Sequence, residues 1–259
     1  MIKKKKALFI VFFIFVNILL AKYSTKYSTK YKIDDNSVDF NFALVIKAGH
    51  SGIKFTDSGI TNSLSFLITA LRIDIDLSDY IRVGVIAGYQ QNGFADSIDI
   101  TALPLSLNLP DRNSESMILG FVVESEPFSI NDYSLDVSLA FDYYKYFRNK
   151  WDINLAIANG TAESSHSFYM VNLSFLFKYN GFSTFTPFVG PTLNLISGNL
   201  NVSEQIMDFS QTQIFKYKQE GLIGLSAGVE LEIGDNWDID LKLNLFSENS
   251  LCITAFYRF

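Results

Sequence analysis

Apolar and polar residues alternate along most of the chain beyond its N-terminal region. Phe40, Phe42 and Leu44 would share one side of an extended chain, with Asn41 on the other side. A period of two residues is typical of a β-strand that has one apolar and one polar face. After residue 21 no apolar run approaches the length of about 18 residues that a membrane-spanning helix needs. The apolar content of 48% must therefore be distributed by alternation.

Twelve segments show this pattern and are predicted to be strands. They span residues 38–48, 67–77, 81–89, 97–109, 117–123, 133–143, 151–158, 169–179, 185–195, 225–233, 237–245 and 251–259. The predicted fold is all-β, a transmembrane antiparallel up-and-down β-barrel that occupies residues 38–259. The segments 97–109 and 151–158 can also be read as loops, which would leave ten or eight strands.

The lengths of the predicted connections support a barrel. Tight joints follow every second strand, at residues 78–80, 110–114, 148–150, 180–183 and 234–236. The longer connections span residues 49–62, 126–132, 159–166 and 197–213. Short turns on one rim and long loops on the other are typical of a transmembrane barrel, whereas a soluble β-sandwich would not be expected to separate them in this way. We expect the rim with the tight turns to face the periplasm.

The N-terminal region has the layout of an export signal. Four lysines at residues 3–6 precede an apolar run at residues 7–20, and Ala21 follows. We predict a cleavable signal peptide at residues 1–21, since the apolar run is shorter than the roughly 20 residues of a spanning helix. The repetitive, basic stretch at residues 22–37 is predicted to be a flexible periplasmic tail.

The last segment, Leu251–Phe259, is predicted to close the barrel. Ala255, Tyr257 and Phe259 fall on its apolar side, and Phe259 is the final residue. Pairing of this strand with the first one would remove the last open edge of the sheet.

These residues carry a resemblance to a known class of proteins. The chain from about Phe40 to Phe259 resembles bacterial outer-membrane β-barrel proteins, in particular the porin-like outer membrane protein β-barrel families. The similarity is carried by Ala-Leu-Pro-Leu-Ser-Leu-Asn-Leu at residues 102–109, by Thr-Pro-Phe-Val-Gly-Pro-Thr-Leu at residues 186–193, and by the terminal Thr-Ala-Phe-Tyr-Arg-Phe. The resemblance implies a location in the cell outer membrane, with outer-membrane lipid and the barrel assembly machinery as partners. It also implies that Ala255, Tyr257 and Phe259 act as a terminal assembly signal. Many small members of these families have eight strands, fewer than the twelve segments found here.

The polar side of the strands is rich in charges, which we expect to line a lumen. These residues are Arg72, Asp74, Asp76, Arg82, Asp136, Asp142, Asp152, Glu230, Glu232, Asp238, Asp240, Lys242 and Arg258. Charges at these positions are tolerable only if the lumen is polar, because a Lys or Arg on the lipid face near the midplane costs about 2–4 kcal/mol. Two uses remain open. The charges pair into a network that closes the bore, or they line a narrow path in which the excess of acids favours cations.

Composition excludes several classes of function. Removal of residues 1–21 leaves 17 basic and 27 acidic residues, a net charge of −10, which disfavours binding to nucleic acid. Cys252 is the only cysteine, so no internal disulfide is possible, and no Cys/His cluster indicates a metal site. No cofactor is implied.

Catalysis is not expected. The two histidines, His50 and His166, are each followed directly by serine, so neither forms the His-x-Ser spacing of outer-membrane phospholipases. Both are predicted to be ordinary solvated residues at loop edges on the outer rim. Asp74 and Asp76 are paired, but they lie near a tight turn, at the wrong rim for an outer-membrane protease.

The sequence therefore predicts a porin-like or structural outer-membrane barrel. A narrow, weakly cation-preferring passive channel for small solutes is one form of this function. The alternative is a surface barrel that binds a ligand or mediates adhesion through its extracellular loops, of which residues 197–213 form the longest. An outer-membrane hydrolase is the least favoured reading.

Overall fold

A computed structural model describes residues 40–78, 80–94, 99–100, 107–108, 114–154 and 159–258. The predicted signal peptide at residues 1–21 and the predicted tail at residues 22–37 lie outside this part of the chain, as does Phe259. A search of the described residues finds no helix that is long and apolar enough to cross a membrane.

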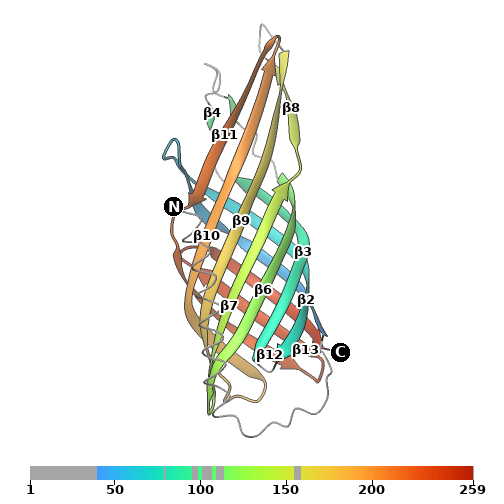
Figure 1. Cartoon of the computed structure of the whole chain (residues 1–259), viewed down its shortest axis with the longest axis vertical. Coiled ribbons are helices and arrows are strands. Elements are labelled where there is room, and N and C mark those ends of the chain that lie inside the picture. The colour runs from blue at the N-terminus through green and yellow to red at the C-terminus, as the bar shows by residue number, and fades with distance from the viewer. Residues whose placement is uncertain are drawn as a thin grey trace.

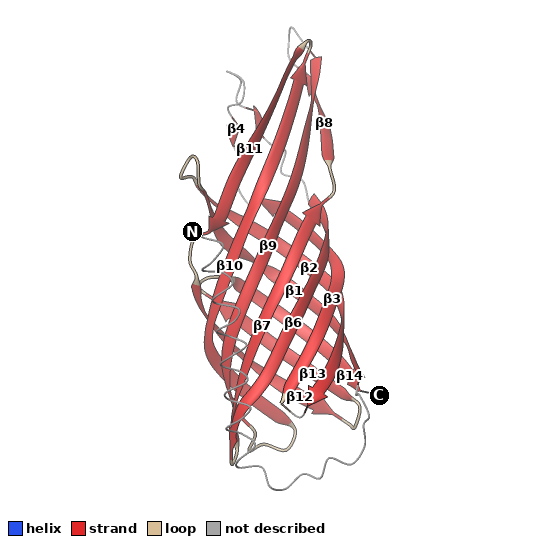
Figure 2. Cartoon of the chain, viewed as in Figure 1, coloured by secondary structure: helices blue, strands red, loops and turns tan. Residues whose placement is uncertain are grey.

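The described strands form one antiparallel ring (Figures 1 and 2). Its members, in spatial order, are β1 (Phe40–Phe55), β2 (Thr61–Ser78), β3 (Ile81–Phe94), β6 (Ser114–Ile130), β7 (Tyr133–Tyr146), β9 (Asn159–Tyr179), β10 (Phe185–Ile206), β12 (Ile223–Ile233), β13 (Trp237–Leu245) and β14 (Asn249–Arg258). Each described ring strand pairs with the next one along the chain that belongs to the ring. The predicted up-and-down barrel is thus confirmed, with ten strands in the described ring.

The last described strand closes the ring on the first. Phe42 lies opposite Tyr257 and Leu44 lies opposite Ala255, in a continuous antiparallel register. The expected pairing of the two terminal strands is confirmed. Both chain ends of the barrel therefore lie at one rim, which we call the terminal rim, and the opposite rim is called the distal rim.

Two predicted ring strands are absent from the ring. Within residues 97–109 the structure describes only a small separate pair, β4 (Asp99–Ile100) with β5 (Leu107–Asn108). Within residues 151–158 it describes part of β8 (Asn149–Asn154), which pairs only with the distal end of β9. The alternative of ten strands is therefore the one that the described ring matches.

Strand β11 (Phe209–Gln219) occupies a region that was partly predicted as a loop. It forms a hairpin with the distal half of β10 and reaches β1 only at its end, where Ile53, Lys54 and Phe55 pair with it. Strands β8, β9, β10 and β11 therefore continue as a sheet beyond the closed ring, as the upper part of Figure 1 shows.

These pairings change the predicted arrangement of the connections. The joint predicted at residues 148–150 for the rim with tight turns lies at the distal end of β7, and Ser114, the only described residue of the joint predicted at residues 110–114, begins β6 at its distal end. The predicted long distal loop at residues 126–132 is a tight turn at the terminal rim, because β6 extends to Ile130 and β7 begins at Tyr133. The reason is that two segments counted as ring strands are not, so the parity of every connection between them is inverted.

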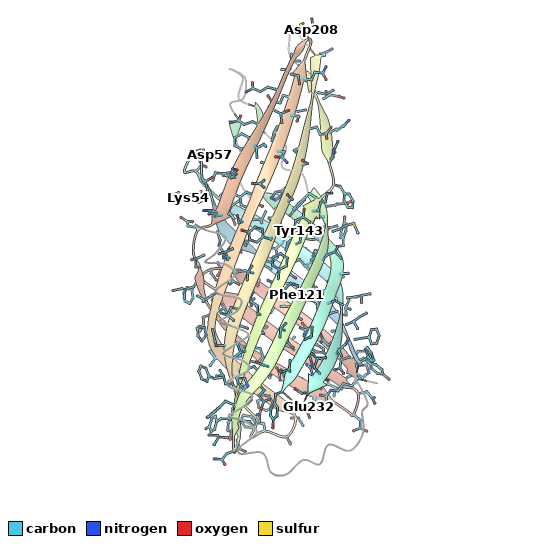
Figure 3. All side chains as sticks on the ribbon, viewed as in Figure 1. Lys54, Asp57, Phe121, Tyr143, Asp208 and Glu232 are labelled. Atoms are coloured by element: carbon cyan, nitrogen blue, oxygen red, sulfur yellow. The ribbon has the colours of Figure 1, made fainter. Side chains whose placement is uncertain are left out.

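The outer wall of the ring is apolar over a limited height. Exposed side chains on this face include Leu44, Leu71, Leu119 and Val189, which would be unfavourable in water. Aromatic residues line both edges of this apolar band, as in the girdles of lipid-facing barrels. Tyr89, Tyr143 and Tyr169 line the distal edge, whereas Tyr133, Phe185, Trp237 and Tyr257 line the terminal edge. Figure 3 shows Phe121 and Tyr143 on this wall and Glu232 near the terminal rim.

Candidate functional site in the barrel interior

The terminal half of the interior holds a network of ion pairs centred on Arg72. Arg72 Nε donates a hydrogen bond to Asp74 Oδ1 at 2.7 Å, and Arg72 Nη2 lies 2.8 Å from Glu124 Oε2. Arg82 Nε bonds Asp76 Oδ1 at 2.7 Å, and its Nη1 lies 3.9 Å from the same Glu124 oxygen. Glu124 thus joins two arginine–aspartate pairs from neighbouring strands into one network.

The aromatic ring of Phe256 and the side chain of Lys178 extend this polar layer around the barrel wall. The Arg72 guanidinium carbon lies 5.5 Å from the centre of the Phe256 ring, which places an aromatic face beside the charge. Farther around the wall, Lys178 Nζ lies 2.5 Å from Asp136 Oδ2 and also pairs with Glu230. These contacts link β2 to β14, and β7 to β9 and β12.

The remaining predicted charges sit mostly on the inner face. Arg258 Nε donates to Asp238 Oδ2 at 2.6 Å near the terminal rim. Asp142, Asp240 and Lys242 are half-buried and alternate with outward apolar neighbours, whereas Glu232 is exposed at the terminal rim. The structure thus places these side chains on one polar face.

Asp152 is the exception among the predicted charges. It is exposed and lies on β8, which is not a member of the ring. The prediction that Asp152 lines the lumen is wrong, because it assumed that residues 151–158 cross the membrane.

The interior also contains a charge that comes from a turn. Glu248 follows the short turn after β13 and is buried, with Lys47 Nζ 2.6 Å from its Oε1. Ser250 Oγ donates to the same oxygen at 2.5 Å, and Asn244 Nδ2 donates at 3.2 Å. The turn at Phe246 has a positive φ of 75°. Only this reversal directs the carboxylate inward, so alternation along a strand could not identify it.

The distal half of the interior holds a large apolar and aromatic cluster, although polar side chains such as Gln90, Glu204 and Gln219 are also buried there. The buried members of this cluster are Val45, Ile53, Phe55, Leu64, Phe66, Ile68, Ala70, Ile118, Tyr144, Tyr146, Phe168, Met170, Ile196, Leu200, Val202 and Tyr217, with Ile86, Phe215 and Cys252 packed against them. These side chains come from eight of the ten ring strands and from β11. We call this set the interior core. A water-filled channel would have to pass through the interior core to reach the distal rim.

His166 is part of the wall of this core and not a solvated loop residue. It is 7% exposed, its ring stacks on Tyr146 with centroids 4.3 Å apart, and its Nε2 hydrogen-bonds the hydroxyl of Tyr217. The prediction of a solvated His166 is wrong, because β9 begins at Asn159 and directs residue 166 inward. His50, by contrast, is exposed, and Asn249 Nδ2 lies 3.2 Å from its Nε2.

Burial controls the charge of His166. The neighbouring Ser167 is an outward polar residue, two residues beyond the girdle residue Tyr169, so His166 lies distal to the apolar band. Burial lowers the pKa of His166 to about 3, since the charged imidazolium would lose its hydration. The imidazole is therefore neutral at physiological pH. In the described residues, no group of three or more His, Cys, Asp or Glu side chains could hold a metal ion.

Comparison with protein families gives one match. Residues 130–251, slightly less than half of the chain, match the family model described as Opacity family porin protein. The matched range runs from the β6–β7 turn into β14 and includes β11. No curated protein sequence matches the chain.

Three solved structures illustrate what the chain is similar to. The outer membrane protease OmpT from Escherichia coli is 12% identical, with a TM-score of 0.48, and covers 88% of this chain and 100% of its own. The translocator domain of the autotransporter NalP from Neisseria meningitidis is 12% identical, with a TM-score of 0.47, and covers 88% of this chain and 91% of its own. Ail, the attachment invasion locus protein of Yersinia pestis, is 12% identical, with a TM-score of 0.32, and covers 86% of this chain and 100% of its own. Because these TM-scores lie below 0.5, no function follows from them.

Proposed function

We propose that this chain, which is a bacterial outer-membrane β-barrel protein, is a closed structural barrel that presents a polar sheet at the cell surface. The observation that carries this proposal is the interior core. Tyr217, Ile53, Leu64 and Ile118 are fully buried and come from four different strands, β11, β1, β2 and β6. Close packing of this kind leaves no path for hydrated ions through the distal half.

The polar layer beneath the core supports the same reading. The Arg72–Glu124 and Lys178–Glu230 pairs each join two strands that are separated by one intervening strand, so they hold neighbouring parts of the wall together. Charged groups that neutralise one another in this way have little capacity left to attract a passing ion. We therefore favour the closed-bore use of these charges over the conducting one.

The sheet beyond the ring supplies the proposed binding surface. Its outward face continues the lipid-facing wall, but it is lined by hydroxyl and amide side chains: Ser165, Ser167, Ser197, Asn199, Asn201, Ser203, Gln205, Ser210 and Thr212. Neighbouring groups on this face bond each other, as in the 3.0 Å contact between Ser203 Oγ and Thr212 Oγ1. Figure 3 shows Asp208 at the tip of the β10–β11 hairpin. A flat polar surface on a rigid sheet is suited to contact a hydrophilic ligand or partner.

A planar-bilayer recording tests the closed barrel. We expect no unitary conductance steps from the wild type, because the interior core blocks the bore. A triple variant in which Phe55, Phe168 and Tyr217 are replaced by alanine should produce small steps, since it removes three buried rings.

The matched control removes three rings from the outer wall instead. Phe121, Phe177 and Phe185 are exposed there, so their replacement by alanine should leave the recording silent. Stable wild-type steps as large as those of the core variant would contradict the closed barrel.

A narrow passive channel is the second candidate. The family model that matches residues 130–251 is described as a porin, and acids outnumber bases among the predicted lumen residues. Small wild-type steps with a preference for cations would favour this candidate.

A further inference from the structure

A group of three lysines lies on the outward face where β1 meets β11. Lys54, Lys216 and Lys218 are exposed, whereas the alternating neighbours Ile53, Phe55 and Tyr217 are buried in the interior core. The three lysines therefore point away from the bore, on the same face as the lipid-contacting wall. We call them the lysine cluster. Figure 3 shows Lys54 and Asp57 at this position beside the distal rim.

The cluster brings like charges together without compensation. Lys54 and Lys218 are direct cross-strand partners in the β1–β11 pairing. Like charges opposite each other destabilise a strand pair. None of the three lysines has a carboxylate within 4.0 Å among the residues that the structure describes, although ten such contacts occur elsewhere in that part of the chain. An anion from outside the chain would relieve this repulsion.

Two acids lie near the cluster, but among the described residues neither forms an ion pair with its lysines. The backbone N–H of Glu220 donates to the Gly52 carbonyl at 3.0 Å, and the Glu220 side chain lies over Gly52. Asp57 Oδ1 accepts from Thr56 Oγ1 at 3.4 Å in the β1–β2 turn. The cluster therefore keeps a local excess of positive charge.

The position of the lysine cluster relative to the apolar band indicates which layer of the membrane surrounds it. On β10, Leu195 is the last outward apolar residue, and the next outward residue, Ser197, pairs directly with Lys218. Lys218 is thus about 7 Å along the strand direction from the hydrocarbon edge. Lys54 lies about 20 Å along β1 from Ala48, so the cluster extends from the boundary into the headgroup layer.

Polar neighbours complete a surface suited to phosphate. Thr61 pairs with Lys54, Ser197 pairs with Lys218, and Asn199 pairs with Lys216. Lysine ammonium groups act as point charges for phosphate, and hydroxyl and amide groups add hydrogen bonds. We propose that the lysine cluster binds the phosphate groups of anionic lipids in the adjoining leaflet of the membrane.

Spin-labelled lipids test this proposal on the full mature chain in vesicles. The vesicles contain phosphatidylcholine with one fifth phosphatidylglycerol, and the label is placed on either lipid. At low salt we expect the immobilised lipid at the barrel surface to favour phosphatidylglycerol by about fivefold, since a lysine near a membrane contributes about 1 kcal/mol. Replacement of Lys54, Lys216 and Lys218 by glutamine should abolish this preference, and high salt should weaken it.

The matched control removes three other cations that lie beyond the apolar band. Arg148 and Lys150 both pair with Glu163, and Lys145 lies on β7, away from the β1–β11 seam. Their replacement by glutamine changes the net charge equally and should leave most of the preference in place. Equal loss in both triple variants would overturn the proposal, because it would show a general charge effect.

A second measurement separates lipid from other anions. If the wild type shows no lipid preference but binds soluble dextran sulfate through the lysine cluster, the proposal that the cluster binds lipid phosphate is wrong. Band shifts on unheated gels establish that each variant is folded. The outcome does not depend on whether the barrel conducts ions.

Discussion

Replacement of Arg72 by methionine is expected to lower the free energy of unfolding by about 3 kcal/mol. Asp74 is fully buried, and its Oδ2 accepts no hydrogen bond from the described residues, so Arg72 is its principal compensation. The substitution would leave Asp74 and Glu124 facing each other without the shared cation. Equilibrium unfolding by urea in lipid vesicles, followed by tryptophan fluorescence, measures the change.

Arg258 provides the matched control for Arg72. It is also an arginine on the inner face paired with an aspartate, Asp238, but its side chain is 50% exposed. Water can replace its contribution, so the change of Arg258 to methionine should cost no more than about 1 kcal/mol. Equal effects of the two substitutions would show that the Arg72 network is as well hydrated as the rim, which contradicts its described burial.

Acidification is expected to destabilise the barrel through His166. The folded protein holds this pKa at about 3, whereas the side chain in the unfolded chain has a pKa near 6.5. The unfolded state therefore binds more protons between these values, and stability is lost as the pH falls through this window. The loss from His166 should approach 4–5 kcal/mol at pH 3, since each pH unit contributes about 1.4 kcal/mol. Unfolding curves recorded from pH 7 to pH 3 measure it.

Two variants separate His166 from the carboxylates that titrate in the same range. Phenylalanine at position 166 keeps an aromatic ring beside Tyr146 and removes the titrating group, so the difference between wild type and variant should shrink as the pH falls. Replacement of the exposed His50 by glutamine should leave the pH profile of the wild type unchanged. A pH profile that is identical in the wild type and the His166 variant would show that the imidazole is accessible to water in the folded state.

The sequence predicts which residues of a strand face outward and which face inward, but it is less informative about which strands pair with one another. The alternation from Phe40 to Leu44 correctly separated outward from inward residues, because a period of two is a local property of each strand. Membership in the ring is not local. Residues 151–158 alternate like a membrane strand, yet β8 pairs only with the distal extension of β9. The alternation of apolar and polar residues indicates that a strand has one apolar face, but it does not indicate whether lipid or protein covers that face.

The interior core escaped prediction for a related reason. Inward positions were expected to be polar, whereas Phe168, Tyr146 and Leu200 on inward positions are apolar and buried. These residues lie beyond the apolar band. The wall no longer contacts lipid there, so the polarity of neither strand face is constrained. Strand β11 was missed because its outward side is as polar as a loop, with Thr212 and Lys216.

The seam between β14 and β1 also sets the order of events in assembly. Asn41 and Arg258 are partners although roughly 200 residues separate them, so this contact is among the most distant in the chain. A fragment of the chain that lacks β14 cannot make it. Without β14, one edge of β1 keeps an unsatisfied row of backbone amide and carbonyl groups, which favours aggregation. Synthesis of β14 is thus required before the ring can close, and a chain that stops short of β14 would remain an open sheet.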